Sequence, residues 1–574
     1  MDKISKENQM SINRIKILRE KYTNLEIDGY IIPKNDKFFS EYAENDRLKN
    51  ISKFTGSAGL AVILKKNNYL FVDGRYTIQA QNESGKNFKI IEIHKKLPSE
   101  IIKNYNLGFD PKLFTSKTMK LYFSGENNLI PINQNLIDLI YKKKKNKTKP
   151  FFSLNKSIIG ESHQSKIKKI INFIKSNKAD YLFVSAPENV AWLLNIRGHD
   201  NPNSPIPNCQ LIIGKNKKFF LITNKENAQK IIKEKKIRLN QLIDSNNFKH
   251  LINKIKEGKF IIDNKTCSIF YEKIIRSKFN IINKNDPIYK LKSIKNSCEI
   301  KHMINAHKHD GLALTKFIYW IKNINKKKIT EVDAQNKLEK LRKLNKNYLF
   351  PSFNTIAGAG SNGAIVHYRA TKKSTKIIKK DDLFLCDSGG QYKYGTTDVT
   401  RTICFSKQTK YIKDIFTKVL KGHIAVAQTN LNKDNNGKKI DARARKFLKK
   451  DGLDYNHGTG HGVGFFLNVH EGPQSISKYN SIKIEKGMVL SNEPGFYKKN
   501  HFGIRIENLV YTNKIKNNLY FENLTLAPIE NDLINYKLLN KNEKDYLFKY
   551  HLNIYAQYSS LLSLKERKWL ASLI

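Results

Sequence analysis

Five side chains in the last third of the sequence have the types and local settings expected of a two-metal site. They are Asp387, Asp398, His461, Glu493 and Glu507. Four carboxylates and one imidazole form a hard, oxygen-rich ligand set, which suits Mn²⁺ or a similar divalent ion better than a thiolate-bound structural zinc. Two cations about 3.5–4 Å apart would offset the repulsion between carboxylates, hold a bridging hydroxide and polarise a carbonyl oxygen. The pattern therefore indicates metal-assisted hydrolysis.

The two aspartates are predicted to lie on neighbouring strands. The apolar run 383–386 predicts a buried strand that ends at Asp387. The β-branched run 396–402, which contains Asp398, predicts the partner strand of a hairpin. The two carboxylates would then face each other across a pair of strands.

The other three candidate ligands lie in turns or at strand ends. His461 stands among four glycines between residues 458 and 464, which permit close backbone approaches. Glu493 follows the apolar run 489–490 and precedes a Pro-Gly pair, so it is expected to end a strand at a turn. Glu507 lies in an alternating stretch that points it to the same face as Arg505.

The simpler interpretation treats each acid as a solvated strand end or turn residue. That interpretation is adequate for any one of them, but it does not explain five suitable residues with two more histidines nearby. Those histidines, His367 and His470, could hydrogen-bond a reacting carbonyl or a leaving group. Taken alone, each fits a structural histidine equally well.

Longer motifs around these residues resemble the Xaa-Pro aminopeptidase family, also called aminopeptidase P. The matching strings are HGTGHGVGFFLNVHEGP at 457–473, DSGGQYKYGTTDVTRT at 387–402, NEPGFY at 492–497 and GIRIEN at 503–508. In the amino-terminal part, FTGSAGLAVIL from Phe54 and VDGRY from Val72 resemble the long, three-domain form of that family. Asn492 and Phe496 depart from its common pattern at positions that are not ligands.

The resemblance implies a pita-bread catalytic fold and a role for each matching residue. Asp387 would bind one metal, His461 and Glu493 the other, and Asp398 and Glu507 would bridge both. His367 and His470 would contact the substrate and the transition state. Apart from the resemblance, the chemistry of the site suggests that Glu493 relays a proton towards the proline nitrogen. The resemblance also assigns supporting roles to three further residues: Arg505 beside the bridging glutamate, Arg75 in peptide binding and Tyr497 close to the metals. From the sequence alone, Arg75 fits a structural ion pair.

We predict an α/β chain of three domains. The first two, residues 1–150 and 151–288, would be related α/β domains like the creatinase N-terminal domain, and residues 289–574 would form the catalytic domain with a C-terminal extension. Asp28 before 29–32 parallels Asp180 before 181–184, and the stretch 60–81 parallels 210–229, which indicates a duplication. Chance similarity between two such segments is the alternative.

Two local features accompany these limits. The basic run 142–150 would be a solvated linker or helix end. Ser297 could cap a long helix from 299 to 321 at the start of the third domain.

The implied substrate is a peptide with a penultimate proline, and the implied reaction is hydrolysis of the bond before that proline by a bridging hydroxide. Three alternatives remain. A prolidase would cleave only dipeptides, a creatinase-like amidinohydrolase would lack the metal ligands, and a catalytically inactive pita-bread domain could bind histones or nucleic acid. The complete ligand set and the two additional domains favour the aminopeptidase.

The chain is strongly basic, with 104 Lys+Arg against 51 Asp+Glu and a net charge of +53. Such a charge ordinarily suggests nucleic-acid binding. The excess is mostly lysine, accompanies abundant Asn and Ile, and is spread through every segment, as an AT-rich coding sequence produces. Since no zinc-finger spacing, RNA-binding aromatic signature or helix-turn-helix pattern stands out, we expect no specific nucleic-acid partner.

Compartment and assembly follow from less specific features. Five cysteines without Cys-x-x-Cys spacing make a disulfide framework unexpected and favour a reducing compartment. No apolar signal core or bilayer-length apolar run is present, so we expect a cytoplasmic protein without membrane association. The family resemblance implies a homodimer.

Overall fold

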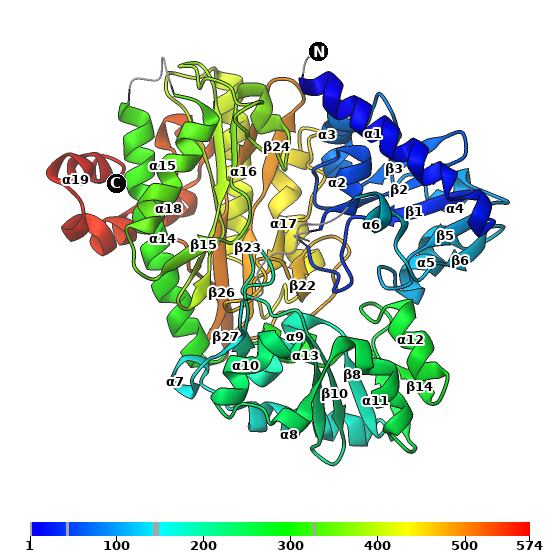
Figure 1. The fold of residues 1–574 in the computed structure, drawn as a ribbon. Helices are drawn as coiled ribbons and strands as arrows, with labels where there is room; N and C mark the ends of the chain where they lie inside the picture. The colour runs from blue at the N-terminus through cyan, green and yellow to red at the C-terminus, as the bar shows by residue number, and fades with distance from the viewer. Residues whose placement is uncertain (1–2, 42–44, 142–148, 325–328) are drawn as a thin grey trace. The chain divides into compact units, whose positions relative to one another are not determined.

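The computed structural model describes residues 3–41, 45–141, 149–324 and 329–574, apart from the side chains of residues 3–8 (Figure 1). The chain divides into two compact units. Unit 1 comprises Met1–Asn155 and Glu161–Ile288, and unit 2 comprises Lys156–Gly160 and Tyr289–Ile574. The basic linker predicted at 142–150 lies mostly outside the described residues, and the domain limits at residues 150 and 288 stay predictions.

The first part of unit 1 is a six-stranded sheet with the order β4-β3-β2-β1-β5-β6. Tyr30 and Ile32 of β1 enter the core on one face of this sheet, and Ile31 enters the core on the other. Because both faces are covered, the strands read as continuous apolar runs. The strands are β1 Gly29–Pro33, β2 Gly59–Leu64, β3 Asn68–Val72, β4 Lys89–Glu92, β5 Asn106–Phe109 and β6 Asn128–Pro131; the helices are α1 Lys3–Glu20, α2 Arg47–Ser52, α3 Thr77–Ser84, α4 Pro98–Ile101, α5 Ser116–Phe123 and α6 Leu136–Ile140.

The second part of unit 1 repeats this arrangement with the sheet order β12-β11-β10-β8-β13-β14. A short two-stranded pair, β7 with β9, accompanies it. The strands are β7 Phe152–Ser153, β8 Tyr181–Val184, β9 Ile196–Arg197, β10 Gln210–Gly214, β11 Phe219–Ile222, β12 Leu242–Ile243, β13 Lys259–Ile262 and β14 Asn280–Asn283; the helices are α8 His163–Ser176, α9 Pro187–Leu194, α10 Lys225–Lys233, α11 Phe248–Lys254 and α12 Ile269–Arg276.

The two six-stranded sheets match strand for strand and direction for direction. In each, the central strand pairs antiparallel with the next long strand and parallel with the strand on its other side. Asp28 bonds Lys65 at 2.7 Å and accepts the first N–H of β5 at 3.0 Å. Asp180 bonds Lys215 at 2.6 Å and accepts the first N–H of β13 at 2.8 Å. The predicted duplication is confirmed down to this side-chain detail.

Unit 2 carries the longest described helix and the remaining sheets. In Figure 1, α14 and α15 lie side by side, and Phe317 and Leu338 from these helices pack with Phe384 and Val399 of the sheet β16-β17-β20. A second core joins Val419 of α16 to other helices and to the two-stranded sheet β24-β25. The helices are α7 Lys156–Ile159, α13 Ile288–Ser293, α14 Ser297–Asn323, α15 Glu331–Lys343, α16 Lys410–Ala427, α17 Gly437–Lys449, α18 Lys541–Tyr558 and α19 Leu564–Ala571.

The strands of unit 2 form two three-stranded sheets, β16-β17-β20 and β15-β18-β19, one five-stranded sheet, β22-β21-β23-β26-β27, and the pair β24-β25. Their bounds are β15 Tyr348–Pro351, β16 Ile356–Ala359, β17 Phe384–Ser388, β18 Gly390–Tyr392, β19 Gly395–Thr396, β20 Val399–Ile403, β21 Gly460–Gly462, β22 Glu471–Ile476, β23 Val489–Asn492, β24 Gly495–Lys498, β25 Phe502–Arg505, β26 Asn508–Ile515 and β27 Asn518–Asn523.

Three local predictions need correction. The cap of α14 is Asn296 rather than Ser297: its side chain accepts the N–H groups of Cys298 and Glu299, and a Glu299 oxygen accepts the N–H of Asn296. The strands β17 and β20 pair antiparallel, but they are not a hairpin, because β18 and β19 intervene and pair with each other in another sheet. The alternating stretch before Glu507 is also interrupted, since β25 ends at residue 505 and β26 begins at 508.

Candidate metal centre

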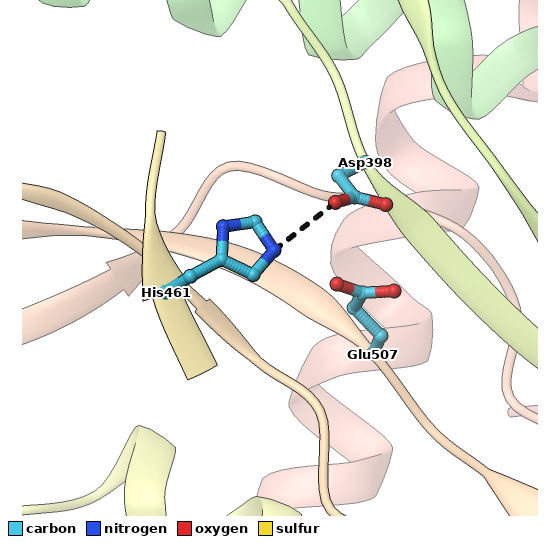
Figure 2. A group of neighbouring side chains, drawn as sticks. All are labelled: Asp398, His461 and Glu507. Atoms are coloured by element: carbon cyan, nitrogen blue, oxygen red, sulfur yellow. Dashed lines mark ion pairs between the residues drawn. The ribbon is translucent and has the colours of Figure 1, made fainter. Parts of the chain in front are cut away.

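Three of the five predicted ligands, Asp398, His461 and Glu507, form a compact group (Figure 2). Asp398, His461 and Glu507 each offer a ligand atom within 4.8 Å of the others. The Nε2 atom of His461 is 3.4 Å from an Asp398 oxygen, and Figure 2 shows the two carboxylates and the imidazole edge pointing into a common space. The sequence separates these residues by up to 109 positions, so the sheets bring them together.

The backbone around His461 fixes which ring nitrogen is presented. Nδ1 lies 2.9 Å from the carbonyl oxygen of Gly462, which favours the proton on that nitrogen and leaves the lone pair of Nε2 available to a metal ion. The glycines on either side are required by close packing. A Cβ at Gly460 would lie 1.9 Å from the Ser491 carbonyl oxygen, and one at Gly462 would lie 2.2 Å from that of Glu471.

Glu493 joins the group from the end of β23. One of its carboxylate oxygens is 3.5 Å from His461 Nε2 and accepts a hydrogen bond from Ser491 at 3.0 Å. The hydroxyl oxygen of Ser491 also accepts the backbone N–H of His461 at 2.9 Å. Ser491 therefore ties the two side chains to each other.

Asp387 approaches from β17 and is oriented by Arg505. The guanidinium donates to one Asp387 oxygen at 2.6 Å, while the other oxygen is buried and has no hydrogen-bond partner among the described residues. One oxygen of Asp398 is in the same condition. Buried acceptor atoms of this kind are costly unless a proton or a cation meets them.

The electrostatics of the site also suit bound cations. Burial, together with the charges of Asp387 and Glu493, raises the pKa of Asp398 well above its usual range. Burial, followed by the charges of Asp398 and Glu493, does the same to the pKa of Glu507. Carboxylates that repel one another in a buried space fit divalent cations. We call Asp387, Asp398, His461, Glu493 and Glu507 the ligand cluster.

A chain of hydrogen bonds leads from the ligand cluster to the surface. Arg505 donates to the hydroxyl of Tyr497 at 2.7 Å, and that hydroxyl lies 2.8 Å from Nε2 of His457. Burial raises the pKa of Tyr497 to about 12, although the charge of Arg505 opposes this. His457 was not among the predicted site residues, yet it lies four residues before His461 in the same glycine-rich motif, which was the available signal.

His470 and His367 lie in different settings. The exposed ring of His470 meets that of His461 edge to face, with 4.2 Å between ring centroids. His367 is half-buried and follows the short 3-10 helix Gly360–Ala364. Their assignments to substrate and transition state stay predictions.

Arg75 belongs to unit 1 and bonds Asp73 at 2.8 Å, as expected of a structural ion pair. Burial alone would lower the pKa of Arg75, but the neighbouring Tyr76 and Asp73 together raise it. The role of Arg75 in peptide binding stays a prediction.

A second group of possible ligands in unit 2, Cys404, Glu530 and Asp532, has a different character. The ammonium of Lys322 bonds both Glu530, at 2.7 Å, and Asp532, at 2.8 Å. A positive charge therefore already lies between these two carboxylates, so the group does not require a metal ion.

Sequence profiles of four known families match the chain. The profile of metallopeptidase family M24 matches residues 301–514, and that of the C-terminal region of M24 peptidases matches 517–573. Two profiles of the creatinase/prolidase N-terminal domain match residues 14–139 and 142–299. The M24 profile includes every member of the ligand cluster.

Individual relatives match over nearly the whole chain. A probable Xaa-Pro aminopeptidase P of Coprinopsis cinerea is 33% identical over 96% of this chain and 96% of its own length. Xaa-Pro aminopeptidase 1 of Dictyostelium discoideum is 34% identical over 96% of this chain and 94% of its own length.

Two solved structures are similar to this chain over different shares of its length. The X-prolyl aminopeptidase of Caenorhabditis elegans, described as a cytosolic enzyme with a di-nuclear active site, is 29% identical with a TM-score of 0.90 and covers 98% of this chain and 99% of its own. The prolidase of Pyrococcus furiosus is 26% identical with a TM-score of 0.51 and covers 62% of this chain and 99% of its own.

Proposed function

The chain belongs to the Xaa-Pro aminopeptidase family of M24 metallopeptidases, and we propose that its ligand cluster forms the dinuclear centre of such an enzyme. The enzyme releases the first residue of a peptide by hydrolysing its bond to a penultimate proline. The observation that carries this proposal is a buried group of carboxylates whose negative charge is not offset by the surrounding protein.

The residues divide into terminal and bridging ligands. Asp387 would hold one ion, and His461 and Glu493 the other. Asp398 and Glu507 would be shared, which agrees with the strong repulsion that raises the pKa of both acids in the protein alone. When bound, the two cations would activate a water molecule and polarise the scissile carbonyl.

The remaining steps belong to side chains of this protein. Ser491 donates to one oxygen of Glu493, which leaves the second oxygen to accept a proton from the attacking water. Glu493 then delivers that proton to the proline nitrogen as the carbon–nitrogen bond breaks. The exposed ring of His470 beside His461 can donate to the carbonyl oxygen as it gains negative charge. His367 would contact the substrate, and Arg75 would hold the peptide tail.

The substrate explains why the centre takes this form. A peptide bond to proline is a tertiary amide and has no N–H, so an enzyme cannot hold the scissile bond by that donor. A cluster of carboxylates and cations can instead bind the free α-amine of the first residue and the carbonyl oxygen. The enzyme thereby holds the α-amine and the carbonyl oxygen of the first residue, two groups that a following proline does not change.

We further propose that the metal is Mn²⁺ and that the enzyme acts in the cytoplasm. The oxygen-rich ligand set supports manganese. A reducing compartment is supported by five free cysteines, four of them buried. None of the described helices combines the length and apolar character needed to cross a bilayer.

We also propose a homodimer formed through the catalytic domain. The apolar side chains of Phe548 and Leu552 are 50% and 44% exposed on one face of α18, where a partner copy could cover them. Light scattering of the purified protein in solution measures this directly, and a monomeric mass at micromolar concentration would contradict it.

A peptide panel tests the function. The purified protein, its metal content measured by elemental analysis, is supplied with Mn²⁺ and offered Xaa-Pro dipeptides, longer Xaa-Pro peptides and the same peptides with alanine in place of proline. We expect two divalent ions per chain and cleavage of the longer peptides only where proline is second. Cleavage restricted to dipeptides would indicate a prolidase, and a metal-free, inactive protein would indicate a binding module.

A further inference from the structure

A second buried group of charged side chains lies outside the ligand cluster. Glu471 places one carboxylate oxygen 2.6 Å from the ammonium of Lys295 and the other 3.1 Å from that of Lys292. These three side chains are at most 1% exposed. Glu299, also buried, lies close enough to interact electrostatically with Lys295. We call these four residues the lysine network; its two positive and two negative charges sum to zero.

The lysines come from the segment that leads into the catalytic domain. Lys292 lies in α13, and Lys295 follows that helix just before α14. The N–H of Lys295 donates to the carbonyl oxygen of Gly487 at 2.9 Å, and Ile294 forms an isolated antiparallel bridge with Met488. This segment is thus held against the start of β23, the strand that leads to Glu493.

Glu471 is the residue after His470, and it begins β22. Its backbone pairs with Gly462, the neighbour of His461. His470 lies in the bend immediately before this strand, so its backbone is joined directly to that of Glu471. The lysines hold the Glu471 side chain in the interior, and the His470 ring lies against the His461 ring with 4.2 Å between centroids.

We propose that Lys292 and Lys295 are positioning residues for catalysis, which hold Glu471 and through it set the place of the His470 ring. This inference rests on the proposed function and extends it to a segment that contributes no ligand. The connection between unit 1 and α14 then supplies part of the catalytic machinery. A purely structural ion pair would stabilise the fold without any specific link to His470.

A double-mutant cycle separates these two roles. The full-length, Mn²⁺-loaded enzyme is compared with Lys295→Met, His470→Ala and the double variant, by kcat and KM for a short Xaa-Pro peptide and by metal content. We expect Lys295→Met to lower kcat by roughly 10–100-fold with a smaller change in KM, because a displacement of about 1 Å has that cost. The metal content should stay at the wild-type value.

The decisive measurement is the double variant. If Lys295 acts through His470, adding Lys295→Met to His470→Ala lowers kcat by no more than about twofold. The proposal is overturned if the fold-losses in kcat of the two single variants multiply in the double variant. It is also overturned by an unchanged kcat in either single variant or by loss of metal from Lys295→Met. If Lys295→Met does not fold, Lys292→Met replaces it in the same cycle, since the shorter ion pair to Lys295 then remains.

A matched control comes from another, partly buried ion pair in the same unit. Lys421 bonds Glu543 at 2.6 Å and ties α16 to α18. Lys421→Met should leave kcat within about twofold of the wild type and show no coupling to His470→Ala; coupling of the same size would overturn the proposal. If the wild-type enzyme cleaves no Xaa-Pro peptide, the proposed function itself is wrong, and this inference is wrong with it.

Discussion

The ligand cluster and the lysine network are both buried groups of charged side chains in unit 2, and they differ in charge balance. In the lysine network each Glu471 oxygen meets an ammonium, and the lysines hold the pKa of Glu471 below its usual value despite burial. In the ligand cluster, two buried carboxylate oxygens lack partners within the described chain, and the pKa values of Asp398 and Glu507 are raised. Buried charge that is balanced can serve structure, whereas an excess of one sign points to a bound ion.

The group Cys404, Glu530 and Asp532 supports the same distinction. By residue type alone, this group is as good a candidate metal site as the ligand cluster. Lys322 lies between its acids, so it belongs with the lysine network in its charge balance. Residue types therefore identify candidate metal sites, but the surrounding charges decide between them.

The largest expected effect comes from removing a ligand. Glu493→Gln or His461→Ala should reduce turnover of a short Xaa-Pro peptide to background while the circular dichroism spectrum is retained, because the metals lose a ligand and, in the first case, the proton relay is lost as well. Glu485→Gln, which removes an exposed ion pair with Lys290, is the control and should stay active. If turnover survived either ligand change, the ligand cluster would not be the metal site, and its contrast with the lysine network would fail.

Removal of the metal should follow next in size. A chelator should abolish activity and lower the stability by about 2.7 kcal/mol for each of the two ions, relative to protein with ion at about 100 times its Kd, since only the folded state has the site. Activity should return on addition of Mn²⁺. Differential scanning calorimetry and peptide assays on the same samples measure both effects.

The stability effect of the metal should also depend on pH. The folded, metal-free protein keeps protons on Asp398 and Glu507 that the unfolded chain releases above about pH 4, so its stability from these groups falls as pH rises. Bound cations replace those protons. The difference in Tm between loaded and metal-free protein should therefore widen from about pH 5 to about pH 8; a constant difference would show that the carboxylates do not repel one another as described.

A smaller effect is expected at Arg505, which orients Asp387 and Tyr497. Arg505→Lys keeps the charge but loses the two-pronged donor geometry, so metal affinity or kcat should fall by about 10–100-fold. Titration of the metal-free variant with Mn²⁺ measures the affinity. Arg443→Lys at the exposed pair with Asp434 is the matched control, and an equal loss there would argue against a specific role.

The smallest effects test the duplicated sheets, where charges are paired on the surface. Asp28→Asn and Asp180→Asn should each destabilise the protein by about 1 kcal/mol, because each removes an ion pair and weakens a bond to a strand N–H. The pKa of both acids is lowered, chiefly by the paired lysine, so this stabilisation is present at neutral pH and is lost as pH falls through the folded pKa. Urea unfolding at neutral pH compares the two variants, and clearly unequal losses would contradict the equivalence of the domains.

Much of the fold could be predicted because it depends on local patterns. The strands of both N-terminal domains are short apolar runs bounded by polar turns, and the repeated position of Asp28 and Asp180 indicated the duplication. The predictions that needed correction concern chain path: the sequence does not reveal that β18 and β19 separate β17 from β20. The predicted N-cap of α14 was wrong by one residue, since Asn296 and Ser297 are both suitable cap types.

The sequence by itself determined the family, the domain types and the residue types of the ligand cluster, because these follow from motifs and composition within single segments. Only the tertiary structure decided which charges are balanced. The pairing of Glu471 with Lys292 and Lys295, and the link from Arg505 through Tyr497 to His457, join segments up to 179 residues apart. Electrostatic interactions depend on distance and burial in space, and neither quantity can be read from positions along the chain.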